Sequence, residues 1–253
     1  PMRVFVTGAA GFIGSGVVPD LIAAGHTVTG LARSDANVET LKRMGADVLR
    51  GSLEDIDSLK RGSAEADGVI HLAFIHDFAK FAENGQIDKR AIEAMGETLI
   101  GTNKPLVVTS GVGLLAPGRL STEEDVAHVG ESIPRVSENA VLPFATRGVR
   151  VSAVRLPQVH GADGKAGFAE YLFRIARDKG FAAYVGDGSN RWAAAHRADV
   201  APVYRLALEK GVAGACYHAV GDESVRMRDI AEVIGRQLNV PATSIKPEQA
   251  PEH

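Results

Sequence analysis

The chain has 253 residues, 45% of them hydrophobic, which is enough for one large domain or for one domain with a smaller lobe. The formal net charge of −3 argues against nucleic acid or a membrane surface as the main partner. No apolar run reaches the ~18 residues that a membrane span needs, and no signal-peptide pattern precedes the first expected strand, so we expect a cytoplasmic protein. The single cysteine, Cys216, cannot form an internal disulfide and has no neighbouring ligand set, so we expect a buried structural thiol and no metal site.

A glycine-rich turn follows the first apolar run of the chain. We expect a strand over residues 3–7 and a helix over residues 11–24, ended by Gly25 and kinked at Pro19. Glycines between a strand and a helix allow backbone angles that a Cβ forbids, and they leave the helix N–H groups accessible to a pyrophosphate. The alternative is a helix start with packing glycines only. The residues expected to contact a dinucleotide here are Thr7, Gly8, Gly11, Phe12, Ile13 and Gly14.

The end of the second expected strand, residues 27–32, bears on the type of cofactor. Arg33 stands 19 residues after Gly14. A guanidinium at this point favours a ribose 2′-phosphate and hence NADP, whereas an acid favours NAD, and Ser34 adds a hydroxyl donor. The alternative is a solvated surface arginine, with Asp35 acting as the acid. We therefore expect NADP(H), with NAD as the less favoured cofactor.

The next elements bring further candidates to the same edge of the sheet. We expect a helix over residues 38–44, a strand over residues 47–50, and a turn over residues 51–55 that opens a third helix. In a sheet of this type the residues after the third strand line the adenine, so Ser52 and Leu53 are candidate contacts. Ser52 has the alternative role of a helix cap.

A very apolar fourth strand is expected over residues 68–72, as is typical of a buried parallel strand. His71 lies inside it, and we favour a hydrogen-bonded core histidine over a catalyst. In the following loop, His76 either faces substrate or belongs to a capped loop. Small and apolar residues at the end of this strand fit beside the cofactor ribose and phosphates. These candidate contacts are Leu72, Ala73 and Phe74.

Thr109 and Ser110 stand at the carboxyl end of the fifth expected strand, residues 106–109. Ligands of parallel sheets bind at this edge, so both residues are site candidates. The other elements expected around them are a helix over residues 87–100, an acidic loop over residues 121–131, a helix from residue 132 to about residue 146 despite Pro143, and a sixth strand over residues 149–156.

Beyond the sixth strand the strict alternation of strand and helix loosens. The tail after Val240 is rich in proline and charge, and we expect its end to be loosely ordered. The chain thus divides into a dinucleotide-binding core over residues 1–160 and mainly a substrate-binding lobe over residues 161–253, which returns to the core near residues 190–210. The elements expected in this part are helices over residues 168–179, 198–209 and 227–238 and a short strand over residues 216–220.

Several motifs together resemble the extended branch of the short-chain dehydrogenase/reductase superfamily. Within it, the likeness is to the NAD-dependent epimerase/dehydratase-like proteins classed as atypical members. The resemblance implies an α/β fold, with a doubly wound, seven-stranded parallel Rossmann sheet and a small C-terminal substrate lobe, and it adds cofactor contacts at Pro157 and Val159. The matching motifs are Thr7-Gly-x-x-Gly-x-x-Gly14, Val69-Ile-His-Leu-Ala73, Val107-Val-Thr-Ser110, Gly148-Val-Arg-Val-Ser-Ala-Val-Arg155, Arg155-Leu-Pro-x-Val-His-Gly161, and the segment Trp192 to Val200.

One departure from the family pattern concerns its acid/base pair. The family carries Tyr-x-x-x-Lys on the helix after the fifth strand, where the tyrosine exchanges a proton with the substrate and the lysine assists it. The family spacing from Glu138 places Gly130 and Pro134 at those two positions. The usual acid/base machinery is therefore absent from this sequence.

The resemblance leaves one hydroxyl and several substitutes for the missing pair. Ser110 matches the family's substrate-orienting Ser/Thr, although a serine hydroxyl by itself is too weak an acid to donate the proton. The candidates for the donor are His128, His160 and Tyr184, each with an alternative structural role, and Arg135 is the candidate for the lysine charge. The expected catalytic residues are Ser110, His160 and Tyr184, and the expected substrate contacts are His76, His128 and Trp192.

Three functions are consistent with these features. The first is an NADP(H)-dependent oxidoreductase that acts on a carbonyl, an imine or an activated alkene of a small molecule. The second is an NADP(H)-binding protein that reports redox state without catalysis. The third is a nucleotide-sugar epimerase or dehydratase, which we place last because such enzymes normally need the missing tyrosine. The resemblance leaves homodimer formation open.

Overall fold

The computed structural model describes residues 1–75, 78–115, 118–127, 136–161 and 167–252. The chain divides into two compact units. Unit 1 comprises Pro1–Leu156 and Val200–Ala219, and unit 2 comprises Pro157–Asp199 and Val220–His253. The chain leaves unit 1 after Leu156 and returns to it between Val200 and Ala219, for one helix and one strand.

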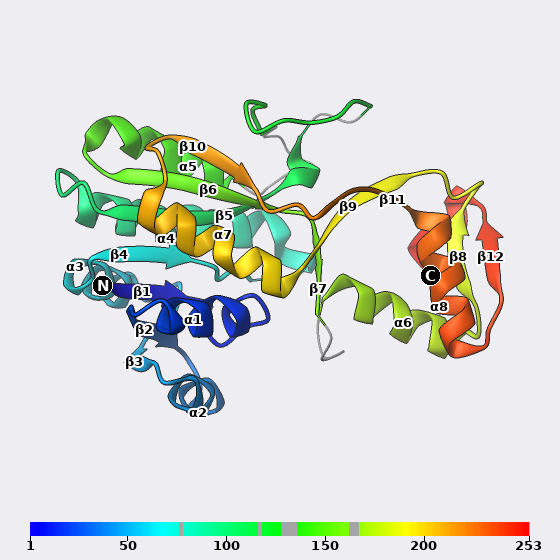
Figure 1. The fold of residues 1–253 in the computed structure, drawn as a ribbon, viewed down its shortest axis with the longest axis horizontal. Helices are drawn as coiled ribbons and strands as arrows, with labels where there is room; N and C mark the ends of the chain where they lie inside the picture. Colours follow the sequence, from blue (N-terminus) through cyan, green and yellow to red (C-terminus); the bar gives the residue numbers. More distant parts are fainter. Residues whose placement is uncertain (76–77, 116–117, 128–135, 162–166, 253) are drawn as a thin grey trace. The chain divides into compact units, whose positions relative to one another are not determined.

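Unit 1 is built on a seven-stranded sheet with the strand order β10-β6-β5-β4-β1-β2-β3 (Figure 1). Every pairing in it is parallel, which confirms the expected seven-stranded parallel sheet. The chain runs outward from β1 to β3 and then returns to β4 beside β1, and parallel sheets bind ligands at the carboxyl end of such a reversal. The strands are β1 (Arg3–Thr7), β2 (Thr27–Ala32), β3 (Asp47–Arg50), β4 (Gly68–His71), β5 (Pro105–Gly111), β6 (Arg150–Leu156) and β10 (Ala215–His218).

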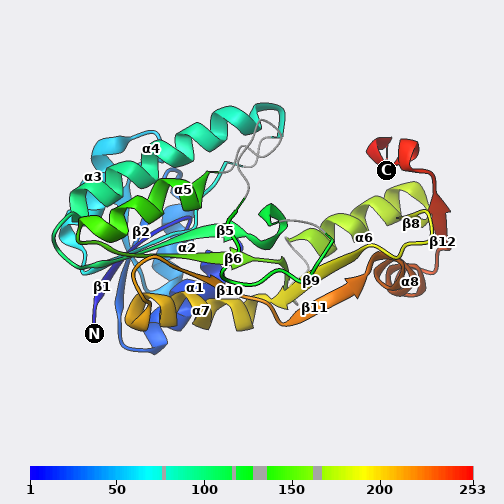
Figure 2. The ribbon, with the colours of Figure 1, turned by 90° about the horizontal axis from the view of Figure 1, so that it is seen from above.

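Helices cover both faces of this sheet, which is why its strands are nearly continuous apolar runs. Figure 2 shows α3, α4 and α5 on one face and α1 and α7 on the other. The core beneath α3 and α4 includes Phe5, Ile92, Met95 and Leu106, all fully buried. The helices are α1 (Gly14–Ala23), α2 (Asp35–Met44), α3 (Ile56–Glu65), α4 (Phe81–Leu99), α5 (Ser137–Val141) and α7 (Arg197–Lys210), of which α7 belongs to unit 1 from Val200 onward.

Several helix boundaries differ from those expected. α1 begins at Gly14 rather than at residue 11, because the residues after Gly8 form the turn itself. α4 begins at Phe81, six residues before the expected start at residue 87. The helix expected from residue 132 is α5 followed by the 3₁₀ segment Leu142–Arg147. Pro143 lacks an N–H and so weakens α-helical hydrogen bonding there, and residues 132–135 lie outside the described part.

Unit 2 contains two small sheets and two amphipathic helices. β7 (Gln158–His160), β9 (Arg191–His196) and β11 (Asp222–Arg226) form a three-stranded sheet, and β8 (Ala182–Val185) pairs in parallel with β12 (Ala242–Ile245). α6 (Phe168–Lys179) and α8 (Met227–Leu238) have the bounds predicted from the sequence. Their apolar faces pack around Ala176, Ala182, Ala231 and Ile234.

The segment after Val240 contains regular elements that the sequence analysis did not predict. Residues Ala242–Ile245 form β12, and Pro247–Glu252 form a 3₁₀ helix. The short strand only becomes stable because it pairs with β8, a partner about sixty residues earlier in the chain.

Among the described residues, no helix combines the length and the apolar character needed to cross a membrane.

Candidate functional site

The turn between β1 and α1 needs its glycines for different steric reasons. Gly8 has a φ of +67°, and a Cβ on it would lie 2.7 Å from the backbone nitrogen of Ala73. A Cβ on Gly14 would lie 2.3 Å from the carbonyl oxygen of Ala9. Gly11 is exposed, and a Cβ on it would meet only the Gly8 carbonyl oxygen, at 3.2 Å. Gly8 and Gly14 thus close the turn, while Gly11 keeps its outer face free of a side chain.

The N-terminus of α1 opens onto this turn. Ile13 occupies the N-cap position, and within the described chain no side chain caps the helix. The turn itself is held by backbone hydrogen bonds from Gly11 N to Gly8 O, at 3.0 Å, and from Ser15 N to Gly11 O, at 2.9 Å. A helix N-terminus carries partial positive charge, so this arrangement suits an anionic group.

Thr7 lies directly before the turn, but its side chain faces the interior. Its Oγ1 accepts a hydrogen bond from Ala73 N at 3.3 Å and lies 2.6 Å from Nδ1 of His71. Nε2 of His71 lies 2.6 Å from the Asp88 carboxylate, which also accepts a hydrogen bond from Ser137. The side chains of this network, those of Thr7, His71, Asp88 and Ser137, are all buried, which confirms the prediction that His71 is a hydrogen-bonded core histidine. Thr7 therefore stabilises the turn through buried side-chain contacts with Ala73 N and His71.

The segments after β3 and β4 approach the same end of the sheet. Leu72, Ala73 and Phe74 are half-buried there. The N-cap of α3 is Asp55, whose carboxylate accepts from Ser58 N at 3.2 Å, and the Ser52 hydroxyl accepts from Asp55 N at 3.2 Å directly before the helix. The further residues expected in this region are Leu53, which is buried in the apolar core, and His76, which lies outside the described residues.

Basic side chains gather where β2 and β3 end. Arg33 is exposed, and Ser34 caps α2 by accepting a hydrogen bond from Asn37 N at 3.2 Å. Arg50, the last residue of β3, forms an ion pair with Asp35 and reaches the Arg33 carbonyl oxygen at 3.5 Å. The hydrogen bond and the charge of Arg50 lower the pKa of Asp35 below its ordinary value. The sequence analysis missed Arg50, although its place at the end of an expected neighbouring strand was a usable signal.

Ser110 and Thr109 both lie inside unit 1. The Ser110 hydroxyl is 1% exposed and donates to Oε2 of Glu138 at 2.5 Å. Thr109 is buried as well, and its hydroxyl donates to the His71 carbonyl oxygen at 3.0 Å and lies 2.8 Å from the Tyr204 hydroxyl. The Ser110 proton is therefore held by a carboxylate in this arrangement.

Glu138 and Arg155 form a buried ion pair that the sequence analysis did not single out. Nε and one terminal nitrogen of Arg155 donate to the Glu138 carboxylate at 3.0 and 2.7 Å, and the Cys216 thiol donates to it at 3.4 Å. Burial alone raises the pKa of Glu138, but the hydrogen bonds from Arg155 and Ser110 and the Arg155 charge outweigh it and leave the pKa lowered. Burial and the nearby Glu138 charge raise the pKa of Cys216, which is half-buried, to about 11.

Arg155 also fixes the acidic loop over the end of β6. Its guanidinium donates to the carbonyl oxygen of Asp125 at 2.5 Å and to those of Thr122 and Glu123 at 3.4 Å. Arg119, two residues before the loop, forms a two-point ion pair with Asp125 inside it. A single buried arginine thus joins a loop, a strand and α5.

The remaining predicted site residues belong to unit 2. The rings of His160 and His196 meet edge to face at 5.4 Å, and Arg228 lies over the Tyr184 ring at 5.3 Å. Trp192 packs against Phe168 at 4.4 Å. The other two, Pro157 and Val159, begin this unit around β7. Ser110 is thus in one unit and both other predicted catalytic residues are in the second, while His128 lies outside the described residues.

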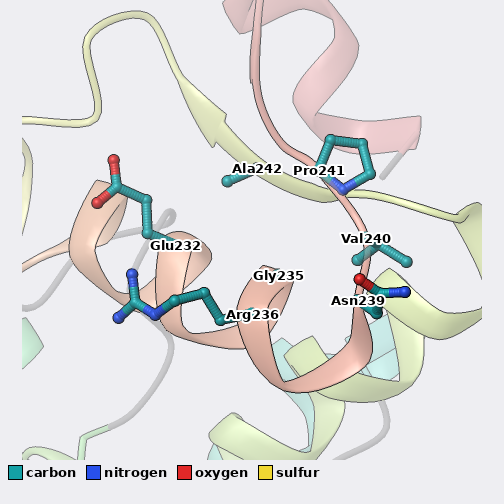
Figure 3. A pocket seen from close by; sticks show the side chains of 7 residues that line it. All are labelled: Glu232, Gly235, Arg236, Asn239, Val240, Pro241 and Ala242. Atoms are coloured by element: carbon teal, nitrogen blue, oxygen red, sulfur yellow. The ribbon is translucent and has the colours of Figure 1, made fainter.

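A pocket of about 490 Å³ lies beside the C-terminal end of α8 in unit 2 (Figure 3). None of the predicted site residues lines it. Its described lining consists of Glu232, Gly235, Arg236, Asn239, Val240, Pro241 and Ala242.

The parallel sheet that reverses at β1 and β4, with a side-chain-free glycine turn at the reversal, defines a Rossmann-type dinucleotide-binding fold. The family model described as the NAD dependent epimerase/dehydratase family matches residues 4–112. The chain belongs to this family.

Similar proteins cover most of the chain. An uncharacterized protein of Schizosaccharomyces pombe is 48% identical and one of Saccharomyces cerevisiae is 47% identical, each over 100% of this chain and 86% of its own length. The 4-hydroxy-2-methyl-3-oxo-4-farnesyl-3,4-dihydroquinoline-1-oxide ketoreductase of Stigmatella aurantiaca is 28% identical, over 92% of this chain and 72% of its own.

Two solved structures have the same fold at low sequence identity. The UDP-glucose 4-epimerase of Thermotoga maritima superposes with a TM-score of 0.79 at 21% identity, over 97% of this chain and 86% of that chain. The dTDP-glucose 4,6-dehydratase DesIV of Streptomyces venezuelae, solved with NAD bound, gives a TM-score of 0.78 at 21% identity, over 97% and 84%.

Proposed function

We propose that the protein is an NADP(H)-dependent oxidoreductase that reduces a carbonyl group, an imine or an activated alkene. The observation that carries the proposal is the turn that exposes Gly11 without a side chain, together with Arg33, which is exposed at the end of β2. The turn suits a diphosphate, and a basic β2 end suits a ribose 2′-phosphate rather than a 2′-hydroxyl.

The residues at the sheet edge fit such a cofactor. A Cβ at Gly8 would collide with the backbone of the segment after β4, and a Cβ at Gly14 would collide with the backbone of the turn. The backbone segments can therefore approach each other closely only because both residues are glycine. Phe12, Ile13 and Gly14 would face the diphosphate, and Leu72 and Ala73 the adjoining ribose. Ser52 and Leu53 are proposed beside the adenine, and Pro157 and Val159 are further proposed cofactor contacts.

A bound nicotinamide supplies or accepts the hydride, so the protein must bind, orient and protonate the substrate. The similarity to a ketoreductase supports a carbonyl substrate. Ser110 would have to exchange its hydrogen bond to Glu138 for one to the substrate before it could polarise that carbonyl. His160 and Tyr184 are the proposed donors of the proton, with Trp192 as a wall of the substrate pocket.

A binding and turnover experiment tests this function. The purified protein is titrated with NADPH and NADH by calorimetry and then mixed with NADPH and a panel of aldehydes, ketones and imines while the absorbance of NADPH is followed. We expect tighter binding of NADPH and turnover that collapses in Ser110→Ala. A protein that binds neither nicotinamide dinucleotide would overturn the proposal.

Arg33 provides the matched test of cofactor type. Arg33→Ala should weaken NADPH binding much more than NADH binding, because only NADPH carries the phosphate that the guanidinium would read. Arg43→Ala is the control, since Arg43 is exposed near the far end of α2 and its described bond is to Thr40. An equal loss for both cofactors would mean that Arg33 does not contact the phosphate.

A second function, NADP(H) binding without catalysis, is favoured by one specific observation. The chain has Gly130 and Pro134 where the family's acid/base pair belongs, and the Ser110 hydroxyl is buried on a carboxylate. Tight NADPH binding with no turnover across a broad substrate panel would select this function. A cytoplasmic location and homodimer formation stay predictions under either function.

A further inference from the structure

We propose that Arg50 sets the cofactor preference by holding the carboxylate of Asp35, so that Asp35 does not accept a hydrogen bond from the cofactor ribose. This inference rests on the proposed binding of a nicotinamide dinucleotide at the β1–α1 turn. It assigns a specificity-determining role to a residue on β3, outside the β2 segment from which cofactor type was predicted.

The geometry brings the two residues together at one sheet edge. In the pairing of β2 with β3, Arg50 stands opposite Ala32, the residue directly before Arg33. The Gly51 N–H donates to the Ala32 carbonyl oxygen at 3.2 Å, which fixes the backbone of Arg50 beside the end of β2. From there the Arg50 guanidinium reaches both the Asp35 carboxylate and the Arg33 carbonyl oxygen.

The charges explain why this pair would decide the preference. A free carboxylate at the end of β2 accepts from a ribose 2′-hydroxyl and repels a 2′-phosphate. Asp35 is two residues beyond Arg33, and its side chain is 93% exposed. Without a partner, its carboxylate would be free to accept from the 2′-hydroxyl and to repel a 2′-phosphate. Paired with Arg50, its charge is compensated and its Oδ1 accepts a hydrogen bond from the guanidinium.

The pair is also well placed to respond to a phosphate. The Arg50 side chain is 55% exposed, and exposed ion pairs are held weakly because water and salt screen them. A dianionic phosphate can therefore share the Arg50 guanidinium with Asp35, next to the exposed Arg33 side chain. The alternative is that Arg50 only steadies the first turn of α2 through Asp35.

Calorimetric titration of four variants with NADPH and NADH separates these readings. Arg50→Ala should weaken NADPH binding about tenfold or more, as expected for the loss of a charge-assisted contact, and should tighten NADH binding about threefold or more as Asp35 is released. Asp35→Asn should leave NADPH binding unchanged or tighter. In the double variant the gain in NADH affinity should disappear, and Arg43→Ala should change neither affinity.

The outcomes distinguish this inference from the proposed function. Equal changes in NADPH and NADH affinity in Arg50→Ala, or a gain for NADH that persists in the Asp35→Asn background, would overturn the role of Arg50 while cofactor binding stands. A wild-type protein that binds neither cofactor would overturn the proposed function itself. Thermal unfolding of each variant identifies a purely structural effect on α2, because that effect would lower the unfolding midpoint and weaken both cofactors alike.

Discussion

Replacement of Glu138 by glutamine removes one charge from the buried pair with Arg155 and leaves the shape of the side chain intact. The two side chains are 3% and 1% exposed, so water cannot take the place of the lost carboxylate. Removal of one partner from a buried ion pair costs about 3–5 kcal/mol, because the other charge stays buried without compensation. For a chain of this size that loss corresponds to a fall of about 6–20 °C in the unfolding midpoint.

The same substitution should change how the free energy of unfolding depends on pH. The folded-state pKa of Glu138 lies below its ordinary value of 4.5, so its contribution is present above that pH and is lost as the pH falls through the folded-state pKa. Wild type should therefore lose stability on acidification below about pH 4.5 more steeply than Glu138→Gln. Denaturant unfolding of both proteins between pH 3 and pH 7 measures the difference.

Two further variants show whether the reasoning is right. Asp229→Asn breaks the exposed pair with Arg226 and should leave the unfolding midpoint unchanged, because exposed pairs contribute little. Arg155→Met should be at least as destabilising as Glu138→Gln and should also make the chain cleavable by trypsin after Arg119, since the acidic loop loses its anchor. A loss below about 1 kcal/mol in Glu138→Gln at pH 7 would refute the account of the buried pair.

Three further substitutions and one chemical modification have defined outcomes. Gly14→Ala should destabilise unit 1 and abolish cofactor binding, because the new Cβ would lie 2.3 Å from a carbonyl oxygen, whereas Gly11→Ala should impair binding more than the unfolding midpoint. Thr7→Val should cost about 1–3 kcal/mol in denaturant unfolding, because Ala73 N and the His71 ring each lose a buried partner; no loss would contradict the internal role of Thr7. Cys216 has a thiol pKa of about 11, so iodoacetamide should modify it slowly at pH 8 in the folded protein and rapidly after unfolding.

Local sequence signals were sufficient to predict several of the elements. The bounds of α6 and α8 were predicted correctly, because each has an amphipathic period that ends at Gly180 or at Asn239, residues that adopt the left-handed conformation. The parallel strands were recognisable as short apolar runs between glycine-containing turns. These signals depend on neighbours in the chain, and so a single sequence contains them.

The short strands β8 and β12 of unit 2 were not predicted from the sequence, and the reason is physical. β8 and β12 have four residues each and no strong alternation of apolar and polar side chains. Such strands are stable only when they pair, and the pairing partner lies far away in the chain. The strand after Val240 was therefore not predicted from the sequence.

The sequence by itself determined the class of this protein: a strand, a glycine turn and a helix at the start of a parallel sheet, with an arginine at the end of β2. Only the tertiary structure decided which polar groups are already engaged. In the folded chain, the side chain of Ser110 contacts Glu138, that of Thr7 contacts His71, and that of Arg50 contacts Asp35. Each of these contacts joins residues 15 to 64 positions apart, and side-chain hydrogen bonds at that separation follow from packing and strand register, which no local pattern encodes.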